Sequence, residues 1–333
     1  MYDQLMLAAL LQGGPQTAKV DVAAELARCA AIESAAERLH CFDTLTGRGQ
    51  PELSVAEEKS APPVQKPSAP DLLVPAAYWN FLAERPILKL TPYKLNYILP
   101  VAYNDSRNEG GWQQVHPGEH LDATEVKFQL SAQVKVWDNI YQGNGDLWLA
   151  YSQLSFWQMY NAGESSPFRE TNYEPEAYLA WTTDWKLWGL TGRVLKIGFV
   201  HQSNGRGGPA SRSWNRVYGA VGMEHGNFAL QVKPWYRLPE AADKDDNPDI
   251  AHYLGYGEVD LYYRWGNHLF HALWRNNLNM DGNRGAVQLD WGFPIYKGLK
   301  GYVQYFNGYG ESLLDYNAAA QRLGIGFMLT DWL

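Results

Sequence analysis

Long stretches of this chain alternate apolar and polar residues with a period of two, which is the pattern of β-strands that separate an apolar from a polar side. Residues 126–136 show it throughout, and similar alternation occurs in 93–103, 228–236, 285–293 and 323–333. Weaker alternation fits strands at 147–159, 173–185, 190–201, 213–223, 253–264, 269–276 and 301–307. The count is about twelve, an even number, and most segments exceed the usual strand of about five or six residues.

Alternation alone leaves two all-β classes open, a soluble sandwich or barrel with its apolar face inward and a transmembrane barrel with its apolar face outward. The strand lengths, the apolar last strand and the 14% aromatic content favour the membrane barrel, whose interfaces are rich in Trp and Tyr. The longest apolar run is Leu5–Leu11, too short for a helical span of about 20 residues. The net charge of −8 argues against a nucleic-acid partner.

The N-terminal part of the chain differs from the rest. Residues 1–48 have the spacing of short helices, with Asp21 as an expected N-cap, and 49–75 form a Pro-rich linker before a barrel domain at 76–333. Cys29 and Cys41 predict one disulfide between two helices of an exported protein, with buried free thiols as the alternative. We expect a periplasmic module, and because no cleavable signal peptide is evident, a mature form of the chain.

Three residues with hydrolase chemistry lie in the stretch FVHQSNGRGGPASRSWNR, residues 199–216. On a strand, His201 and Ser203 share one face with the apolar residues Leu195, Ile197 and Phe199. The following segment is rich in Gly and Pro, and a hairpin there would bring Asn215 beside His201. If this face meets lipid, all three groups lie on the outside of the barrel.

These residue types match nucleophilic catalysis. A Ser203 hydroxyl needs a base such as His201 to take its proton, and Asn215 can fix the tautomer of that imidazole. Asn is neutral, so a bound cation would have to help stabilise the oxyanion. Oxygen ligands that suit Ca²⁺ are available on Ser211, on the backbone near Gly205 and Arg206, and in the acidic pair Asp245-Asp246. The alternative is a set of polar turn residues at a strand end.

The run HQSNGRGGPASRSWNR resembles the signature of the bacterial outer-membrane phospholipase A family. Four further stretches resemble the same family, and the resemblance covers about residues 78–333; they are SSPFRETNYEP at 165–175, VKPWY at 232–236, DDNPDI at 245–250 and GYGESLLDYN at 308–317. The resemblance implies a twelve-stranded barrel that hydrolyses phospholipid acyl esters (A1/A2 and lysophospholipase type), depends on calcium and is activated by dimerisation.

The resemblance also implies roles for single residues. Ser203 would be the nucleophile, His201 the base and Asn215 the orienting residue. The other assignments are Ser211 and the carbonyl of Arg206 as calcium ligands, Ser165 as a ligand donated by the partner subunit, Gln153 as a dimer-interface residue and Asp246 as part of a second calcium site used by the monomer. The chain departs from the family pattern at 207–209, where the sequence is Gly-Gly-Pro, and at its last residue, Leu333.

The sequence leaves three alternatives to a phospholipase open. A passive channel is disfavoured by large residues predicted to fill the lumen, namely Trp235, Arg237, Tyr256 and Tyr302. A non-catalytic assembly or binding barrel would use residues 1–48 as its working part. A lumenal esterase conflicts with the parity that places Ser203 beside Phe199.

Overall fold

The computed structural model describes residues 22–46, 86–114, 116–296 and 299–329. The chain divides into two compact units, with the boundary between Lys66 and Pro67. The domain boundaries predicted at 48 and 75 fall outside the described residues, so that division stays a prediction.

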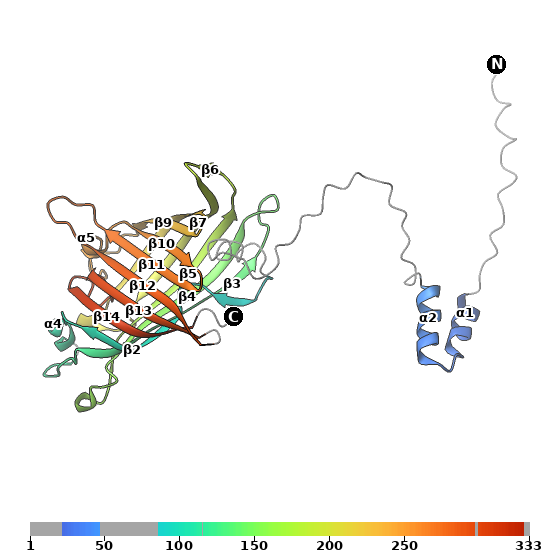
Figure 1. Cartoon of the computed structure of the whole chain (residues 1–333), viewed down its shortest axis with the longest axis horizontal. Helices are drawn as coiled ribbons and strands as arrows, with labels where there is room; N and C mark the ends of the chain where they lie inside the picture. The colour runs from blue at the N-terminus through green and yellow to red at the C-terminus, as the bar shows by residue number, and fades with distance from the viewer. Residues whose placement is uncertain (1–21, 47–85, 115, 297–298, 330–333) are drawn as a thin grey trace, which may run out of the picture. The chain divides into compact units, whose positions relative to one another are not determined.

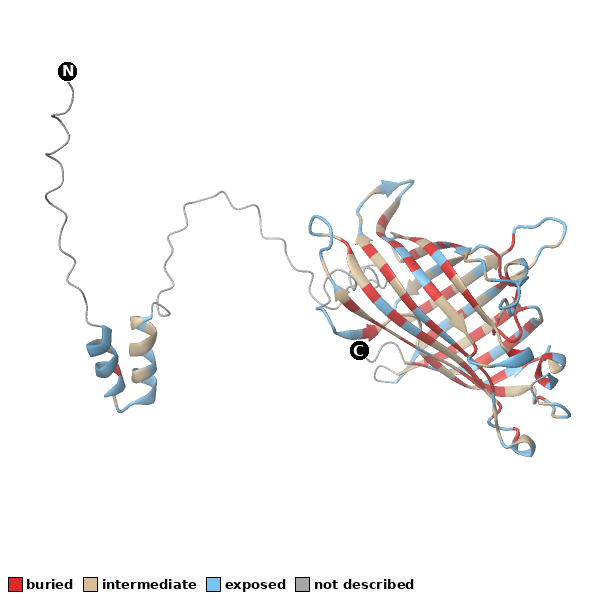
Figure 2. Cartoon of the chain, turned by 180° about the vertical axis from the view of Figure 1, so that it is seen from behind, coloured by how far each residue is buried: buried red, intermediate tan, exposed pale blue. Residues whose placement is uncertain are grey.

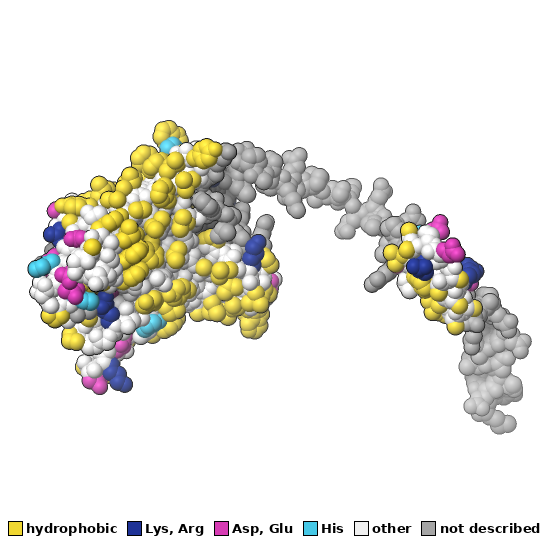
Figure 3. All heavy atoms as spheres, turned by 90° about the horizontal axis from the view of Figure 1, so that it is seen from below, with side chains coloured by type: hydrophobic (Ala, Val, Ile, Leu, Met, Phe, Trp, Pro, Cys, Tyr) yellow, Lys and Arg dark blue, Asp and Glu magenta, His cyan; other side chains and the backbone are white. Residues whose placement is uncertain are grey.

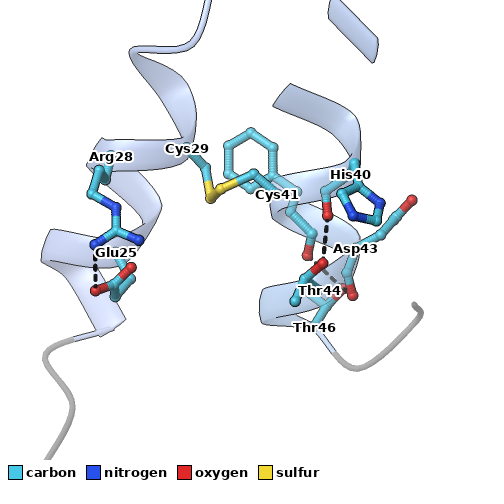
Figure 4. The surroundings of a disulfide bond; sticks show 9 residues. Glu25, Arg28, Cys29, His40, Cys41, Asp43, Thr44 and Thr46 are labelled. Atoms are coloured by element: carbon cyan, nitrogen blue, oxygen red, sulfur yellow. Dashed lines mark hydrogen bonds and ion pairs between the residues drawn. A yellow bond between two sulfur atoms is a disulfide. The ribbon is translucent and has the colours of Figure 1, made fainter. Parts of the chain in front are cut away.

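The N-terminal unit contains a helical hairpin of α1 (Val22–Ala30) and α2 (Ala35–Leu45). A Cys29–Cys41 disulfide joins the two helices, with 5.5 Å between the Cα atoms (Figure 4). The cysteines are therefore paired and not free thiols, and the Cys29 side chain is fully buried. Asp21, the expected N-cap, lies outside the described residues. Of the helices in the described part of the chain, none is long and apolar enough to cross a membrane.

Twelve antiparallel strands close into a ring in the second unit (Figure 1). They are β2 (Tyr97–Asn104), β3 (Thr124–Trp137), β4 (Asp146–Trp157), β5 (Phe168–Thr182), β7 (Leu190–Ser203), β8 (Ser213–His225), β9 (Phe228–Arg237), β10 (Gly257–Trp265), β11 (His268–Asn276), β12 (Gly285–Tyr296), β13 (Leu299–Tyr309) and β14 (Ala319–Met328). The ring closes where β14 pairs with β2, with Ile325 opposite Val101. The predicted all-β class and twelve-stranded antiparallel transmembrane barrel are confirmed.

Shorter elements decorate this ring. Two extra strands, β1 (Leu90–Pro92) and β6 (Lys186–Leu187), pair with β3 and β7. The long connections carry the helical turns α4 (Glu109–Gln113), η1 (Ala162–Glu164), η2 (Gly208–Ala210) and α5 (Ile250–Leu254). Figure 1 shows α4 and α5 at the same end of the barrel. In bacterial outer-membrane barrels such long connections form the extracellular end.

The polar face of each strand points into the lumen and the apolar face points outward. On β3, Glu125, Lys127 and Lys135 are buried whereas Leu130 is exposed. Figure 2 shows this alternation as bands of buried and exposed residues along the strands, and Figure 3 shows hydrophobic side chains over an outer face of the barrel. An apolar exterior over a polar interior is the arrangement of a barrel surrounded by lipid.

The alternation predicted for residues 93–103 is wrong at its start. Tyr97 and Leu99 are buried, whereas Val101 and Tyr103 are exposed, so the phase reverses between Leu99 and Val101. The pairing of β2 with β3 shifts register at the same place, between Leu99 and Ala102. Pro100 lies in this interval and has no N–H to donate to a neighbouring strand, which accounts for a bulge that changes the facing of the side chains.

Buried ion pairs fill the lumen near the end that carries the long connections. Glu125 accepts from Arg169 Nε at 3.0 Å and lies 2.8 Å from Arg322 Nη1. Glu311 pairs with Lys127 at 2.9 Å and with Arg322 at 2.8 Å. Each charge therefore meets an opposite charge, which offsets the cost of removing it from water.

A second polar group lies deeper among the strands. His271 bridges two carboxylates, with Nδ1 2.6 Å from Asp290 and Nε2 3.0 Å from Asp260. A cavity of 190 Å³ lies inside the barrel, and paired side chains such as Glu174 and His271 line it. Trp235 and Tyr302 are buried as expected for lumen-filling residues, but Tyr256 is 59% exposed, so its predicted lumenal position is wrong. Tyr256 precedes β10 in a long connection and is not held to the parity of the strand.

We predict that Glu125→Ala destabilises the barrel, because it leaves Arg169 and Arg322 with fewer partners while both stay buried. Removing one partner of a buried ion pair costs about 3–5 kcal/mol. The measurement is the denaturant concentration at the midpoint of unfolding in detergent or lipid, with the heat-modifiable gel shift as the readout of the folded barrel. Asp105→Asn, at an exposed carboxylate after β2, serves as the control and should stay within about 0.5 kcal/mol of the parent. An unchanged midpoint for Glu125→Ala would contradict a structural role for the network.

Candidate active site on the lipid-facing surface

The hairpin of β7 and β8 carries the predicted catalytic residues on the outside of the barrel. Ile197 and Phe199 of β7 are exposed, whereas the alternate residues Lys196 and Val200 are buried. His201 and Ser203 have the parity of Ile197 and Phe199. Both are half-buried at the end of β7, next to the long connections. His201 and Ser203 therefore face outward, as the sequence predicted. The same parity excludes a lumenal esterase that would use them.

His201 and Asn215 face each other across the hairpin. They are direct cross-strand partners in the register of β7 and β8, and Asn215 Oδ1 lies 2.9 Å from His201 Nδ1. An amide oxygen can only accept a hydrogen bond, so this contact requires the proton of the neutral imidazole on Nδ1. The other nitrogen, Nε2, is then free of a proton and has the form that a general base needs.

Ser203 lies two residues from His201 on the same strand face, opposite Ser213 on β8 and Tyr173 on β5. Within the residues that the structure describes, no hydrogen bond joins the Ser203 hydroxyl to His201. The fold thus brings the three predicted residues to one patch but forms only the His201–Asn215 contact. Hydrogen bonds between nucleophile and base are often long without substrate and tighten in the complex.

Asn204 organises the turn that follows Ser203. Its buried side chain donates from Nδ2 to the carbonyl of Ala210 at 2.8 Å. Its Oδ1 accepts from the backbone N–H groups of Arg206 at 3.3 Å and Arg212 at 3.0 Å. Gly205 has a φ of +66°, and a Cβ there would lie 3.0 Å from the ring of Tyr173, so the turn requires glycine at this position.

The predicted calcium ligands Ser211 and Asp246 meet in the structure. Ser211 Oγ donates to Asp246 Oδ2 at 2.6 Å. The guanidinium of Arg206 is held by Glu170 at 3.2 Å and by the carbonyl of Arg169 at 2.6 Å, which anchors the backbone that carries the Arg206 carbonyl. A hydroxyl, a carboxylate and a carbonyl are hard oxygen ligands, so this donor set fits Ca²⁺.

Acidic residues alone do not build a metal site here. Among the described residues, no group of three or more His, Cys, Asp or Glu side chains is arranged to hold a metal ion. Ser165 lies on a separate connection after η1, is exposed, and has a φ of +61°. In the described part of the chain it forms no hydrogen bond with Arg206, Ser211 or Asp246, so its role stays a prediction.

Gln153 lies on the outward face of β4, with Leu149 and Tyr151 as exposed neighbours of the same parity. Its amide accepts from the Tyr151 hydroxyl at 3.3 Å and donates to Ser155 Oγ at 3.1 Å. The sequence predicted a lipid-facing amide that needs a partner, and the chain itself supplies part of the pairing. One N–H and one lone pair of the amide remain for a further contact.

The loop after β9 lies against the hairpin, and of its residues the sequence had assigned only the acidic pair Asp245-Asp246 to the site. Residues 238–249 follow β9, and the Leu238 N–H donates to the Asn215 carbonyl at 2.8 Å. Asn247, fully buried, accepts from the Ser213 N–H at 2.9 Å. At the end of this loop, Asp249 accepts from the Tyr316 hydroxyl at 2.5 Å, and burial together with this carboxylate raises the pKa of that hydroxyl. The loop has no periodic pattern, so beyond the acidic pair Asp245-Asp246 the sequence offered no signal for these contacts.

Comparison with known proteins assigns the chain to a family. The sequence profile described as Phospholipase A1 matches residues 81–329. The chain belongs to the phospholipase A1 family. The phospholipase A1 of Escherichia coli (strain K12) is 41% identical over 246 residues, which cover 73% of this chain and 82% of that protein. The putative phospholipase A1 of Neisseria meningitidis serogroup B is 40% identical, over 74% of this chain and 67% of that protein.

Solved structures of similar proteins agree with this family assignment. The outer membrane phospholipase A from Escherichia coli is 40% identical, with a TM-score of 0.69, over 74% of this chain and all of that chain. The Salmonella typhi outer membrane phospholipase dimer with bound calcium is 40% identical, with a TM-score of 0.70, over 76% and 96% of the two chains. As a phospholipase A1 family member the chain is a carboxylic ester hydrolase with an outer-membrane β-barrel fold, as predicted.

We predict that Asn204→Ala lowers ester hydrolysis by at least tenfold while the barrel stays folded, because three hydrogen bonds of the turn are lost at once. Asn204→Asp keeps the acceptor oxygen and loses only the donor, so it should lose less activity. The measurements are initial rates with a micellar ester and heat-modifiability on gels. Equal rates for the parent and Asn204→Ala would show that the turn does not position the site.

Proposed function

We propose that this phospholipase A1 family member hydrolyses acyl esters of membrane phospholipids, with A1, A2 and lysophospholipase activity. The reaction uses Ser203, His201 and Asn215 on the lipid-facing surface, depends on calcium and is activated by dimerisation. The observation that carries the proposal is the 2.9 Å contact between His201 and Asn215 on an outward strand face beside exposed apolar residues. A lipid lying alongside the barrel reaches this face without leaving the bilayer.

The chemistry follows from the protonation of His201. Its Nε2 takes the proton from the Ser203 hydroxyl as the oxygen attacks the ester carbonyl, and the same proton then passes to the leaving alcohol. Asn215 keeps the second proton on Nδ1 throughout, so the imidazole stays in the form that can act as a base. Water hydrolyses the acyl-enzyme by the same route and releases the fatty acid.

Calcium, when bound, supplies the positive charge that stabilises the oxyanion of the tetrahedral intermediate. The residues that would hold it are Ser211, the carbonyl of Arg206 and the partner subunit's Ser165, with Asp246 beside Ser211. The donor types support this assignment, and a dimer of Salmonella typhi outer membrane phospholipase is known with bound calcium. An asparagine-to-alanine active-site mutant of the Escherichia coli protein supports a catalytic role for an asparagine.

The location that fits this function is the bacterial outer membrane, with residues 1–48 in the periplasm. A passive channel is the second candidate from the sequence, but buried ion pairs such as Lys127–Glu311 and Arg169–Glu125 occupy the lumen. A non-catalytic assembly barrel would not need the ordered hydrogen bonds of the hairpin.

We predict that purified protein releases fatty acid from phospholipid–detergent micelles only with calcium. Excess EDTA should abolish release and added calcium restore it, because Asn215 alone stabilises the charged intermediates too weakly. Ser203→Ala should lower the rate by at least about a thousandfold, since the nucleophile is lost. Ser213→Ala, the cross-strand neighbour of Ser203, is the matched control and should retain most of the activity. Activity that survives Ser203→Ala would overturn the proposed function.

We predict that Gln153→Ala weakens the dimer and lowers activity most at low protein concentration. An amide paired across an interface inside the membrane contributes about 1 kcal/mol. Sedimentation equilibrium in detergent with calcium measures the dimer directly. Gln321→Ala is the control, because Gln321 also lies on the outward face and also bonds a tyrosine, Tyr305, but between β14 and β13. The interface assignment fails if the two variants associate equally well.

A further inference from the structure

Glu240 approaches the side of Asn215 that faces away from His201. Its Oε1 lies 3.4 Å from Asn215 Nδ2, and the carboxylate is half-buried in the loop of residues 238–249. The loop is docked at this point, because the Leu238 N–H donates to the Asn215 carbonyl at 2.8 Å. Side chain and backbone of Asn215 are therefore both held by the same loop.

The two contacts of the Asn215 amide depend on each other. A carboxylate can only accept, so Glu240 pairs with the NH₂ group of Asn215 and not with its oxygen. The oxygen is then directed to His201 Nδ1. A flipped amide would place oxygen against carboxylate and NH₂ against the imidazole, which would favour the tautomer with its proton on Nε2. That tautomer cannot take the proton of Ser203.

Two other charges near this group have partners of opposite sign. Arg237, at the start of the same loop, pairs with Asp245 at 2.5 Å. Arg216, next to Asn215 in sequence, is buried on the lumenal side and lies 3.3 Å from Glu174. Glu240 therefore brings its negative charge to the outward side of the hairpin, where His201 becomes a cation during the reaction.

We propose that Glu240 is a positioning residue for catalysis, which fixes the orientation of the Asn215 amide and supplies a negative charge behind it. This inference rests on the proposed function of His201 and Asn215. It also explains why position 215 carries a neutral amide. An aspartate there would place two carboxylates at hydrogen-bond distance, and like charges so close disfavour each other's ionisation.

The first test compares Glu240→Ala and Glu240→Gln by the pH dependence of kcat/KM at saturating calcium. Without the carboxylate the imidazolium is less stabilised, so the acid limb should move to lower pH by about half a unit in both variants. Glu240→Ala should lower kcat about tenfold, and Glu240→Gln less, because its amide oxygen still accepts from Asn215. Asp243→Asn, an exposed carboxylate of the same loop, should change neither quantity.

The second test is a double-mutant cycle with Asn215→Asp. Asn215→Asp alone should lose most of the activity, and Asn215→Asp with Glu240→Gln should recover at least fivefold of it, because the repulsion is gone. The calcium concentration for half-maximal activity should stay unchanged in Glu240→Gln. A raised calcium requirement with an unshifted pH profile would instead assign Glu240 to the placement of Asp246 and overturn the proposal.

Failure of this inference is distinguishable from failure of the proposed function. If Ser203→Ala is inactive while both Glu240 variants keep the parental kcat and pH profile, only the role of Glu240 is wrong. If Ser203→Ala stays active, the triad itself is wrong. Heat-modifiability on gels shows whether the barrel of each variant is folded. Activity lost through misfolding is thereby distinguished from activity lost through a missing catalytic contact.

Discussion

The rest of the structure depends on closing the sheet in a medium that offers no hydrogen bonds. Inside a bilayer each backbone N–H and C=O must be paired within the protein, and a sheet achieves this only when its first and last strands meet. The pairing of β14 with β2 closes this ring. Closure forces every second side chain into the lumen, and many of those side chains are charged or polar, so they must pair with one another. The Glu125–Arg169 and Glu311–Lys127 pairs are the consequence.

The same constraint explains how a hydrolase can work from the outer surface of the barrel. His201 and Ser203 stand on the face that lipid touches, where polar groups are costly unless they are paired. They lie at the end of β7, next to the long connections, where Asn215 pairs with His201 and the loop of residues 238–249 in turn holds Asn215. In the proposed function, the medium that surrounds the barrel delivers the substrate. A second copy of the chain on the same surface would then control the activity.

The lumen and the active site share the same strands. Gln202 points inward between His201 and Ser203 and accepts from Trp214 Nε1 at 2.7 Å, and Arg216 stacks over Trp214 at 4.0 Å. Glu174 lies beside Arg216 and continues the contacts to β5. The wall that carries the proposed catalytic residues on its outer side is thus fixed from inside by a buried aromatic ring and an ion pair.

Sequence alone determined what depends on period and local turn chemistry: the twelve strands, the outward parity of His201 and Ser203, and the hairpin that faces Asn215 toward His201. These follow because side chains alternate on any strand and because Gly205 and Asn204 favour a turn. The alternation predicted for residues 93–103 was nevertheless wrong at Pro100, where the missing N–H reverses which side chains face the lumen. Only the tertiary structure decided the contacts of Glu240 and Asn247 with the hairpin and the meeting of Ser211 with Asp246. Those contacts join segments about 25 to 35 residues apart through the loop that follows β9, and an aperiodic loop carries no local pattern from which its contacts can be predicted.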